Sequence, residues 1–82
     1  MNKELIYKYD ICTCSDTEIY QNQCNVIKKK FPNYFIKTLD DVDGTEICIL
    51  VEGDNKIKVC NDMNIGAVYV ESTFDLLPYF AK

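Results

Sequence analysis

The chain has 82 residues, of which 48% are hydrophobic and 27% charged, and its formal net charge is −4 at neutral pH. This length supports a single domain spanning residues 1–82, and the apolar fraction argues against a disordered chain. No apolar run approaches the length of a membrane span, and the first residues lack the layout of a signal peptide, so we expect a cytoplasmic protein with no membrane partner.

The basic residues are all lysines, because the sequence contains no arginine, and it contains no histidine either. Nucleic-acid binders rely on basic patches and arginine forks, so the acidic balance predicts that the chain does not bind nucleic acid. The basic run Lys28–Lys30 is expected at the end of a helix, where it complements the helix dipole. The lack of histidine removes the commonest general base and every Cys–His zinc site.

The first third of the chain predicts a strand followed by a helix. Apolar and polar residues alternate over residues 4–11, which is typical of a half-buried strand. The sequence of residues 15–18, SDTE, matches a capping box with Ser15 as the N-cap. The apolar residues that follow recur at helical spacing: Tyr20, Cys24, Ile27 and Phe31. This pattern predicts an amphipathic helix of about four turns, which Pro32 and Asn33 end.

Three further strands are predicted at residues 34–39, 46–52 and 56–60. A three-residue loop, Gly53–Asn55, between the last two would place their β-branched residues on one shared face, with Asn55 in the left-handed conformation. In this register Cys48 lies directly opposite Cys60 on the other face. Residues in the two strands that we expect beneath the helices are Ile47, Ile49, Val51, Ile57 and Val59.

The C-terminal part predicts a short extended stretch and a last helix. Residues 67–71 form the extended stretch. Ser72 can cap the helix, and the alternative is a start nearer Asp75, because Pro78 removes a backbone donor from the second turn.

The order of elements predicts an α+β fold. We expect one compact β-α-β-β-β-α domain with two helices on one face of a four-stranded mixed sheet. A strand–helix–strand unit normally makes a right-handed parallel crossover, which favours the first strand inside the sheet, parallel to the second and antiparallel to the third. The alternative is a meander in which the second and third strands pair directly through the six-residue connection.

The five cysteines are the candidate reactive residues. An odd count in a chain without a secretion signal favours free thiols over structural disulfides. Cys12 ends the first strand and Cys14 precedes the expected N-cap, where the helix dipole favours a thiolate. A Cys-x-Cys pair can form a strained, reducible disulfide, so Cys12 and Cys14 are the candidate catalytic residues. Cys24, Cys48 and Cys60 are interpreted as buried structural residues.

A metal site is the weaker interpretation of the cysteines. If the first and third strands were neighbours, Cys12, Cys48 and Cys60 would converge on one face and suit a thiophilic metal. The sequence contains no Cys-x-x-Cys motif, so we expect neither a metal nor a cofactor. Asp41, in the acidic turn at residues 40–44, and Glu52 are spaced like the first and last ligands of a calcium loop. Glu46 occupies the position that requires glycine, which excludes that site.

Four stretches carry a resemblance to a known family: ICTC at 11–14, KKKFP at 28–32, EICILVEGDNKIKV at 46–59 and GAVYVESTFDLL at 66–77. Together they span most of the chain, which resembles the selenoprotein W-like branch of the thioredoxin fold. The resemblance implies a thioredoxin-like domain and thiol–disulfide chemistry at Cys12 and Cys14, where one thiol attacks and its neighbour resolves the mixed disulfide. The family motif is Cys-x-x-Cys, from which the Cys-x-Cys spacing departs.

Two functional hypotheses follow from the sequence. The first is a small thiol-redox or redox-dependent binding protein that uses Cys12 and Cys14. The alternative is a small acidic protein-interaction module of the inhibitor or immunity type, encoded by a phage or mobile element, without catalytic activity. In both, the expected partner is another protein.

Overall fold

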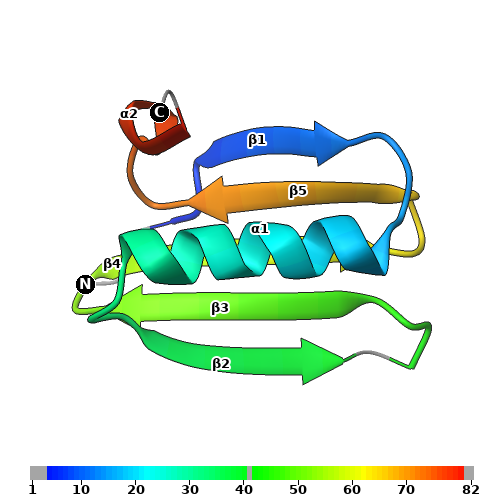
Figure 1. Ribbon diagram of the computed structural model, residues 1–82, viewed down its shortest axis with the longest axis horizontal. Helices are drawn as coiled ribbons and strands as arrows, with labels where there is room; N and C mark the ends of the chain where they lie inside the picture. The colour runs from blue at the N-terminus through cyan, green and yellow to red at the C-terminus, as the bar shows by residue number, and fades with distance from the viewer. Residues whose placement is uncertain (1–3, 41, 81–82) are drawn as a thin grey trace.

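A five-stranded antiparallel sheet, with one long helix across one face, forms the framework of the protein in a computed structural model that describes residues 4–40 and 42–80 (Figure 1). Its elements are β1 Tyr7–Cys12, α1 Thr17–Lys30, β2 Phe35–Asp40, β3 Glu46–Glu52, β4 Asn55–Asp62, β5 Ala67–Ser72 and α2 Leu77–Phe80. The strand order is β1-β5-β4-β3-β2, and every neighbouring pair is antiparallel. Strands make up more of the chain than helices.

This strand order corrects the fold class predicted from the sequence. The four-stranded mixed sheet with two helices on one face is wrong, and so is the thioredoxin-like arrangement: β1 lies at one edge, and β2 pairs with β3 as a hairpin. The physical reason is residues 67–72, which form a full interior strand rather than a short extended stretch. Because β5 hydrogen-bonds to both β1 and β4, it separates β1 from the centre of the sheet.

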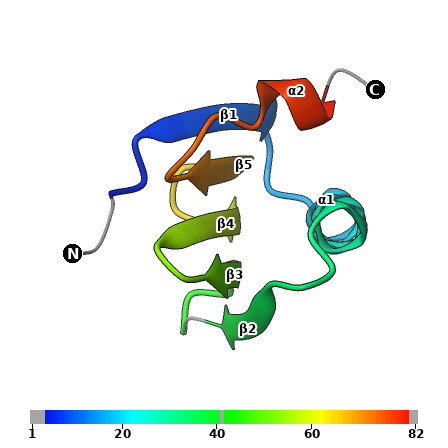
Figure 2. The same cartoon turned by 90° about the vertical axis from the view of Figure 1, so that its left-hand side faces the viewer.

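Helix α1 connects the two edges of the sheet. β1 and β2 run in the same direction at opposite edges, and α1 crosses the face between them as a right-handed connection (Figure 1). Figure 2 shows α1 packed on one side of the sheet, while the other side carries neither of the described helices. The crossover therefore has the predicted hand, but it spans three intervening strands.

The predicted apolar stripe of α1 is confirmed, because Tyr20, Cys24 and Ile27 are buried. They form the core together with the helix-facing residues of the three interior strands. These strand residues are Cys48, Leu50, Ile57, Val59, Val68 and Val70. The helix begins one residue later than predicted. Asp16, not Ser15, is the N-cap, and its carboxylate accepts a hydrogen bond from the Ile19 N–H at 3.0 Å.

The C-terminal segment closes the core beside β1. Leu76 is fully buried, and its N–H donates to the Tyr9 hydroxyl at 2.8 Å. That hydroxyl donates to Asp75 at 2.9 Å, and Asp75 also accepts a hydrogen bond from the Leu77 N–H. The short helix α2 thus starts after Asp75, which was the alternative to a start at Ser72.

The β3–β4 turn determines which residues of β3 face the helix. Gly53 and Asp54 form a two-residue turn, with Gly53 at a φ of 59° and no positive φ at Asp54, the pattern of a type II′ turn. The predicted three-residue loop is wrong, and Asn55 pairs with Glu52 instead of adopting a left-handed conformation. Such turns match the twist of the strands they join, which favours two residues over three.

The turn shifts the hairpin register by one residue relative to the prediction. Cys48 lies opposite Val59, and Ile47 lies opposite Cys60, so the predicted Cys48–Cys60 neighbour pair is wrong. Because the side-chain period of a strand is two, this shift moves Cys48 under α1 and turns Ile49 away from it.

A buried asparagine joins the start of α1 to the sheet. Asn61 is 0% exposed, and its side-chain oxygen accepts a hydrogen bond from the Asp16 N–H at 3.0 Å. Its amide donates to Glu46 at 3.0 Å, and Glu46 accepts a second hydrogen bond from the Thr17 hydroxyl at 2.8 Å. The network fixes the N-terminus of α1 over the ends of β3 and β4.

We expect Asn61→Ala to lower the free energy of unfolding by about 2–3 kcal/mol, because it leaves buried polar groups without partners and opens a small cavity. Urea unfolding under reducing conditions measures the change. The control is Asn22→Ala on the exposed side of α1, which should change stability by less than about 0.5 kcal/mol. Equal effects at the two positions would contradict a specific role for Asn61.

Gly53→Ala should destabilise the protein by about 1–2 kcal/mol, because an L side chain disfavours the left-handed conformation. A Cβ at this position would meet nothing within 4 Å, so the loss isolates the backbone conformation from any steric clash. Asp54→Ala, in the same turn, is the control and should have little effect. A neutral Gly53→Ala would argue against the type II′ turn, and thus against this register.

Candidate functional site

The predicted reactive pair lies at the end of β1, on the connection to α1. The sulfur atoms of Cys12 and Cys14 are 3.2 Å apart, within hydrogen-bond reach of each other. Cys14 is exposed and Cys12 partly buried, and both are free thiols. The chain therefore brings the two thiols together, although in a different setting from the predicted one, because β1 is an edge strand.

The surroundings of Cys14 favour the thiol over the thiolate. The hydrogen bond to Cys12 is the largest cause of a raised pKa at Cys14, followed by the charge of Cys12, desolvation and the charge of Asp16. Asp16 occupies the N-cap, where its carboxylate accepts the helix hydrogen bond and adds negative charge beside Cys14. This negative charge opposes the effect of the helix dipole, which favours the thiolate.

The other three cysteines are buried in two different places. Cys24 and Cys48 share a hydrogen bond under α1, which raises the pKa of Cys24 and lowers that of Cys48. Cys60 points to the opposite side of the sheet, where it shares a hydrogen bond with Tyr69. The hypothetical convergence of Cys12, Cys48 and Cys60 does not occur, and the described residues contain no cluster of three or more groups suited to a metal.

A cleft of about 290 Å³ lies between α1 and the β2–β3 hairpin. The residues that line it are Tyr20, Gln21, Cys24, Asn25, Lys28, Thr38, Asp40, Glu46 and Cys48. Lys28 is one of the helix-end lysines predicted from the sequence, and its charge contributes to the lowered pKa of Cys48. The Cys48 thiol is 0% exposed, so it is not accessible to a reactant in the cleft.

The side of the sheet that faces away from α1 is covered by neither of the described helices (Figure 2). We call it the open face, and its residues are Lys8, Asp10, Phe35, Lys37, Leu39, Ile47, Ile49, Val51, Lys56, Lys58, Cys60, Asp62, Ala67, Tyr69 and Glu71. In an antiparallel sheet, residues in register point to the same face, so these side chains form rows across the strands.

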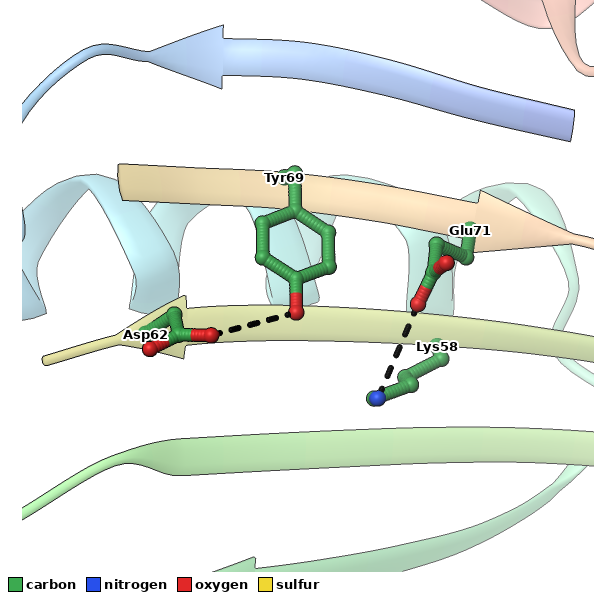
Figure 3. Close-up of polar contacts among 4 residues, drawn as sticks. All are labelled: Lys58, Asp62, Tyr69 and Glu71. Carbon is green, nitrogen blue, oxygen red and sulfur yellow. Dashed lines mark hydrogen bonds and ion pairs between the residues drawn. The ribbon is translucent and has the colours of Figure 1, made fainter. Parts of the chain in front are cut away.

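The half of the open face on β1, β5 and β4 is polar and internally paired. Lys58 forms an ion pair with Glu71 at 3.6 Å, and the Tyr69 hydroxyl donates to Asp62 at 3.5 Å (Figure 3). The Lys8 ammonium lies 4.6 Å from the centre of the Tyr69 ring, a cation–π geometry. These contacts pair Lys8, Lys58, Asp62 and Glu71 within the chain.

The half of the open face on β3 and β2 is apolar, and we call it the apolar patch. It consists of Phe35, Leu39, Ile47, Ile49 and Val51. Phe35 is 75% exposed and Leu39 is 42% exposed, while the three β3 residues are half-buried. The sequence predicts that the β3 residues lie in the core beneath the helices, and the register places them in this patch instead. The signal that could have found it is the Gly53–Asp54 pair, since a two-residue turn pairs Val51 with Lys56.

The patch continues to a free edge of the sheet. All six residues of β2 are exposed, and one side of the strand pairs with β3 in unbroken register from Phe35 to Asp40. No described strand pairs with its other side. The opposite edge differs, because β1 shifts register between Asp10 and Cys12. An irregular edge of this kind is a poor template for a further strand, whereas β2 is regular.

No protein-family model, curated protein or solved structure matches the chain. Within residues 4–40 and 42–80, no helix is long and apolar enough to span a membrane.

The raised pKa of Cys14 predicts a pH profile for its alkylation. Because the thiol holds its proton above the usual pKa, the iodoacetamide reaction of Cys14 should rise with pH at a higher midpoint than for an ordinary thiol. Cys12→Ala removes the largest cause and should move the midpoint down. Peptide mapping by mass spectrometry resolves Cys14 from the buried thiols. A wild-type midpoint below the ordinary thiol value would contradict this picture and favour an activated redox pair.

Proposed function

We propose that the protein is a small protein-interaction module whose open face binds a partner protein. The observation that supports this best is the apolar patch, which gathers residues of two strands on a surface that no described element covers. Contiguous exposed apolar surface of this kind marks interaction sites in small proteins, whereas single exposed apolar residues need no explanation. A protein partner, rather than nucleic acid, agrees with the net charge of −4.

Charges beside the patch define the chemistry of the partner surface. Lys37 and Lys56 lie among the apolar residues, and among the described residues neither forms an ion pair. Lys58 is already paired with Glu71. A partner surface that is apolar at its centre and acidic at its rim complements this arrangement. The lysine stems also add apolar contact area around the patch.

A thiol-redox role for Cys12 and Cys14 is the second candidate. The 3.2 Å separation of the two sulfur atoms supports it, since oxidation to a disulfide requires only a small approach. The raised pKa of Cys14 opposes it, because the thiolate is the attacking species. The interaction module is therefore the better supported function.

The proposed function predicts that changes in the apolar patch remove partner binding. The double variant Phe35→Thr with Leu39→Thr keeps strand-forming side chains and removes exposed apolar surface. A partner isolated from a lysate of the encoding organism on the immobilised protein is identified by mass spectrometry, purified and titrated directly by calorimetry. We expect the double variant to bind it about tenfold or more weakly, from loss of apolar burial.

The matched control is Val26→Thr with Ile65→Thr, which changes two exposed apolar residues outside the open face. This variant should bind the partner as tightly as the wild type. Thermal unfolding of each variant confirms that it is folded. If no protein binds specifically, or if both double variants bind it equally well, the open face is not the interaction surface.

A further inference from the structure

We infer that the partner binds as an extended strand added antiparallel to the free edge of β2, with a carboxylate opposite Lys37 and apolar side chains opposite Phe35 and Leu39. This inference rests on the proposed function and specifies its partner. The edge is free among the described strands, all six of its residues are exposed, and its pairing with β3 is regular. Main-chain hydrogen bonds to such an edge provide affinity, and alternate side chains provide specificity.

The rows of the open face determine what the added strand carries. One row crosses all five strands in register and contains Lys8, Glu71, Lys58, Ile49 and Lys37. Lys8 lies over an aromatic ring and Lys58 pairs with Glu71, whereas Lys37 ends the row with no ion pair among the described residues. An acidic residue in the next strand would lie directly opposite Lys37 and complete the row.

The two adjacent rows end in apolar residues. Lys56, Val51 and Phe35 form one of them, and Cys60, Ile47 and Leu39 form the other. Side chains along a strand point alternately to the two faces of the sheet, so every second residue shares a face. In the added strand, the residues two positions before and two positions after the carboxylate therefore lie beside Leu39 and Phe35. The added segment therefore has the sequence pattern apolar-x-acidic-x-apolar, where x is any residue that points to the other face.

A second copy of this chain fits the edge less well. Antiparallel pairing of two β2 strands about a two-fold axis keeps both open faces on the same side, so only every second register is allowed. The register that joins Phe35 to Leu39 of the second copy also places Lys37 opposite Lys37, and like charges directly opposite are destabilising. The next allowed register pairs the same number of β2 residues and places Lys37 opposite Leu39 of the second copy. Neither gives Lys37 a carboxylate.

The test uses two synthetic seven-residue peptides, Thr-Val-Thr-Glu-Thr-Val-Thr and the same peptide with lysine in place of glutamate. Each is titrated to millimolar concentration into the isotope-labelled protein, and amide shifts are followed by nuclear magnetic resonance. We expect the glutamate peptide to shift the β2 amides and to bind about fivefold more tightly than the lysine peptide. Lys37→Glu should reverse that preference. Lys29→Glu, an exposed lysine on α1, should leave it unchanged.

The outcomes separate this inference from the proposed function. Shifts confined to Ile47, Ile49 and Val51, with β2 unaffected, would overturn strand addition while agreeing with binding on the open face. Equal affinity of the two peptides, or a preference that Lys37→Glu does not reverse, would overturn the role of Lys37. Absence of any shift at millimolar peptide would overturn strand addition, and the partner titration then tests the open face by itself. Circular dichroism of both lysine variants confirms that they are folded.

Discussion

The two-residue turn at Gly53 and Asp54 is the constraint on which the arrangement of the molecule depends. It sets the pairing of β3 with β4 and thereby which residues of β3 face α1. A change of one residue in this turn would exchange the two faces of β3, and with them the surroundings of Cys48 and Ile49. The burial of Cys48 beside Cys24 under α1 and the position of Ile47, Ile49 and Val51 on the open face are therefore two consequences of one turn.

This register places β-branched residues on the less buried side, and the cross-strand neighbours explain how the sheet tolerates it. Val51 lies opposite Lys56, and Ile49 opposite Lys58. A lysine stem is four methylene groups long and can cover a neighbouring apolar side chain while its ammonium stays in water. The three β3 residues are accordingly half-buried although no described helix lies above them, whereas Phe35 on the edge strand remains largely exposed.

The sequence predicted local structure better than it predicted topology. The spacing of Tyr20, Cys24 and Ile27 leaves one apolar helix face, so α1 was found nearly in full. The strand at residues 67–72 was predicted only as a short extended stretch over 67–71. A short apolar run without clear alternation does not by itself indicate an interior strand. The crossover rule specifies the hand of a strand–helix–strand unit but not how many strands lie between its ends, which left the strand order open.

In the candidate sites, too, features set by neighbouring residues could be predicted from the sequence, whereas features set by strand pairing could not. The approach of Cys12 to Cys14 could be predicted, since two residues separated by one are always near each other. The setting of Cys14 could not, because it depends on whether Ser15 or Asp16 accepts the helix hydrogen bond, and the structure places the carboxylate there. Predicting the apolar patch would have required the registers of both the β2–β3 and the β3–β4 hairpins. Placing all the β-branched residues of β3 and β4 on one face led instead to a three-residue turn, which is wrong.

Lys37 places a positive charge between the two apolar open-face residues of the edge strand β2. Natural sheets protect exposed edges with charged residues, irregular strands or covering segments. β1 has a register shift, while β2 is regular and its protection is a single lysine between Phe35 and Leu39. A lysine in that position repels its own copy in the register that would best join the apolar residues, and it attracts a strand with a carboxylate at the same point. Under the proposed strand addition, the same side chain would therefore oppose self-association through this edge and favour a partner strand that carries a carboxylate.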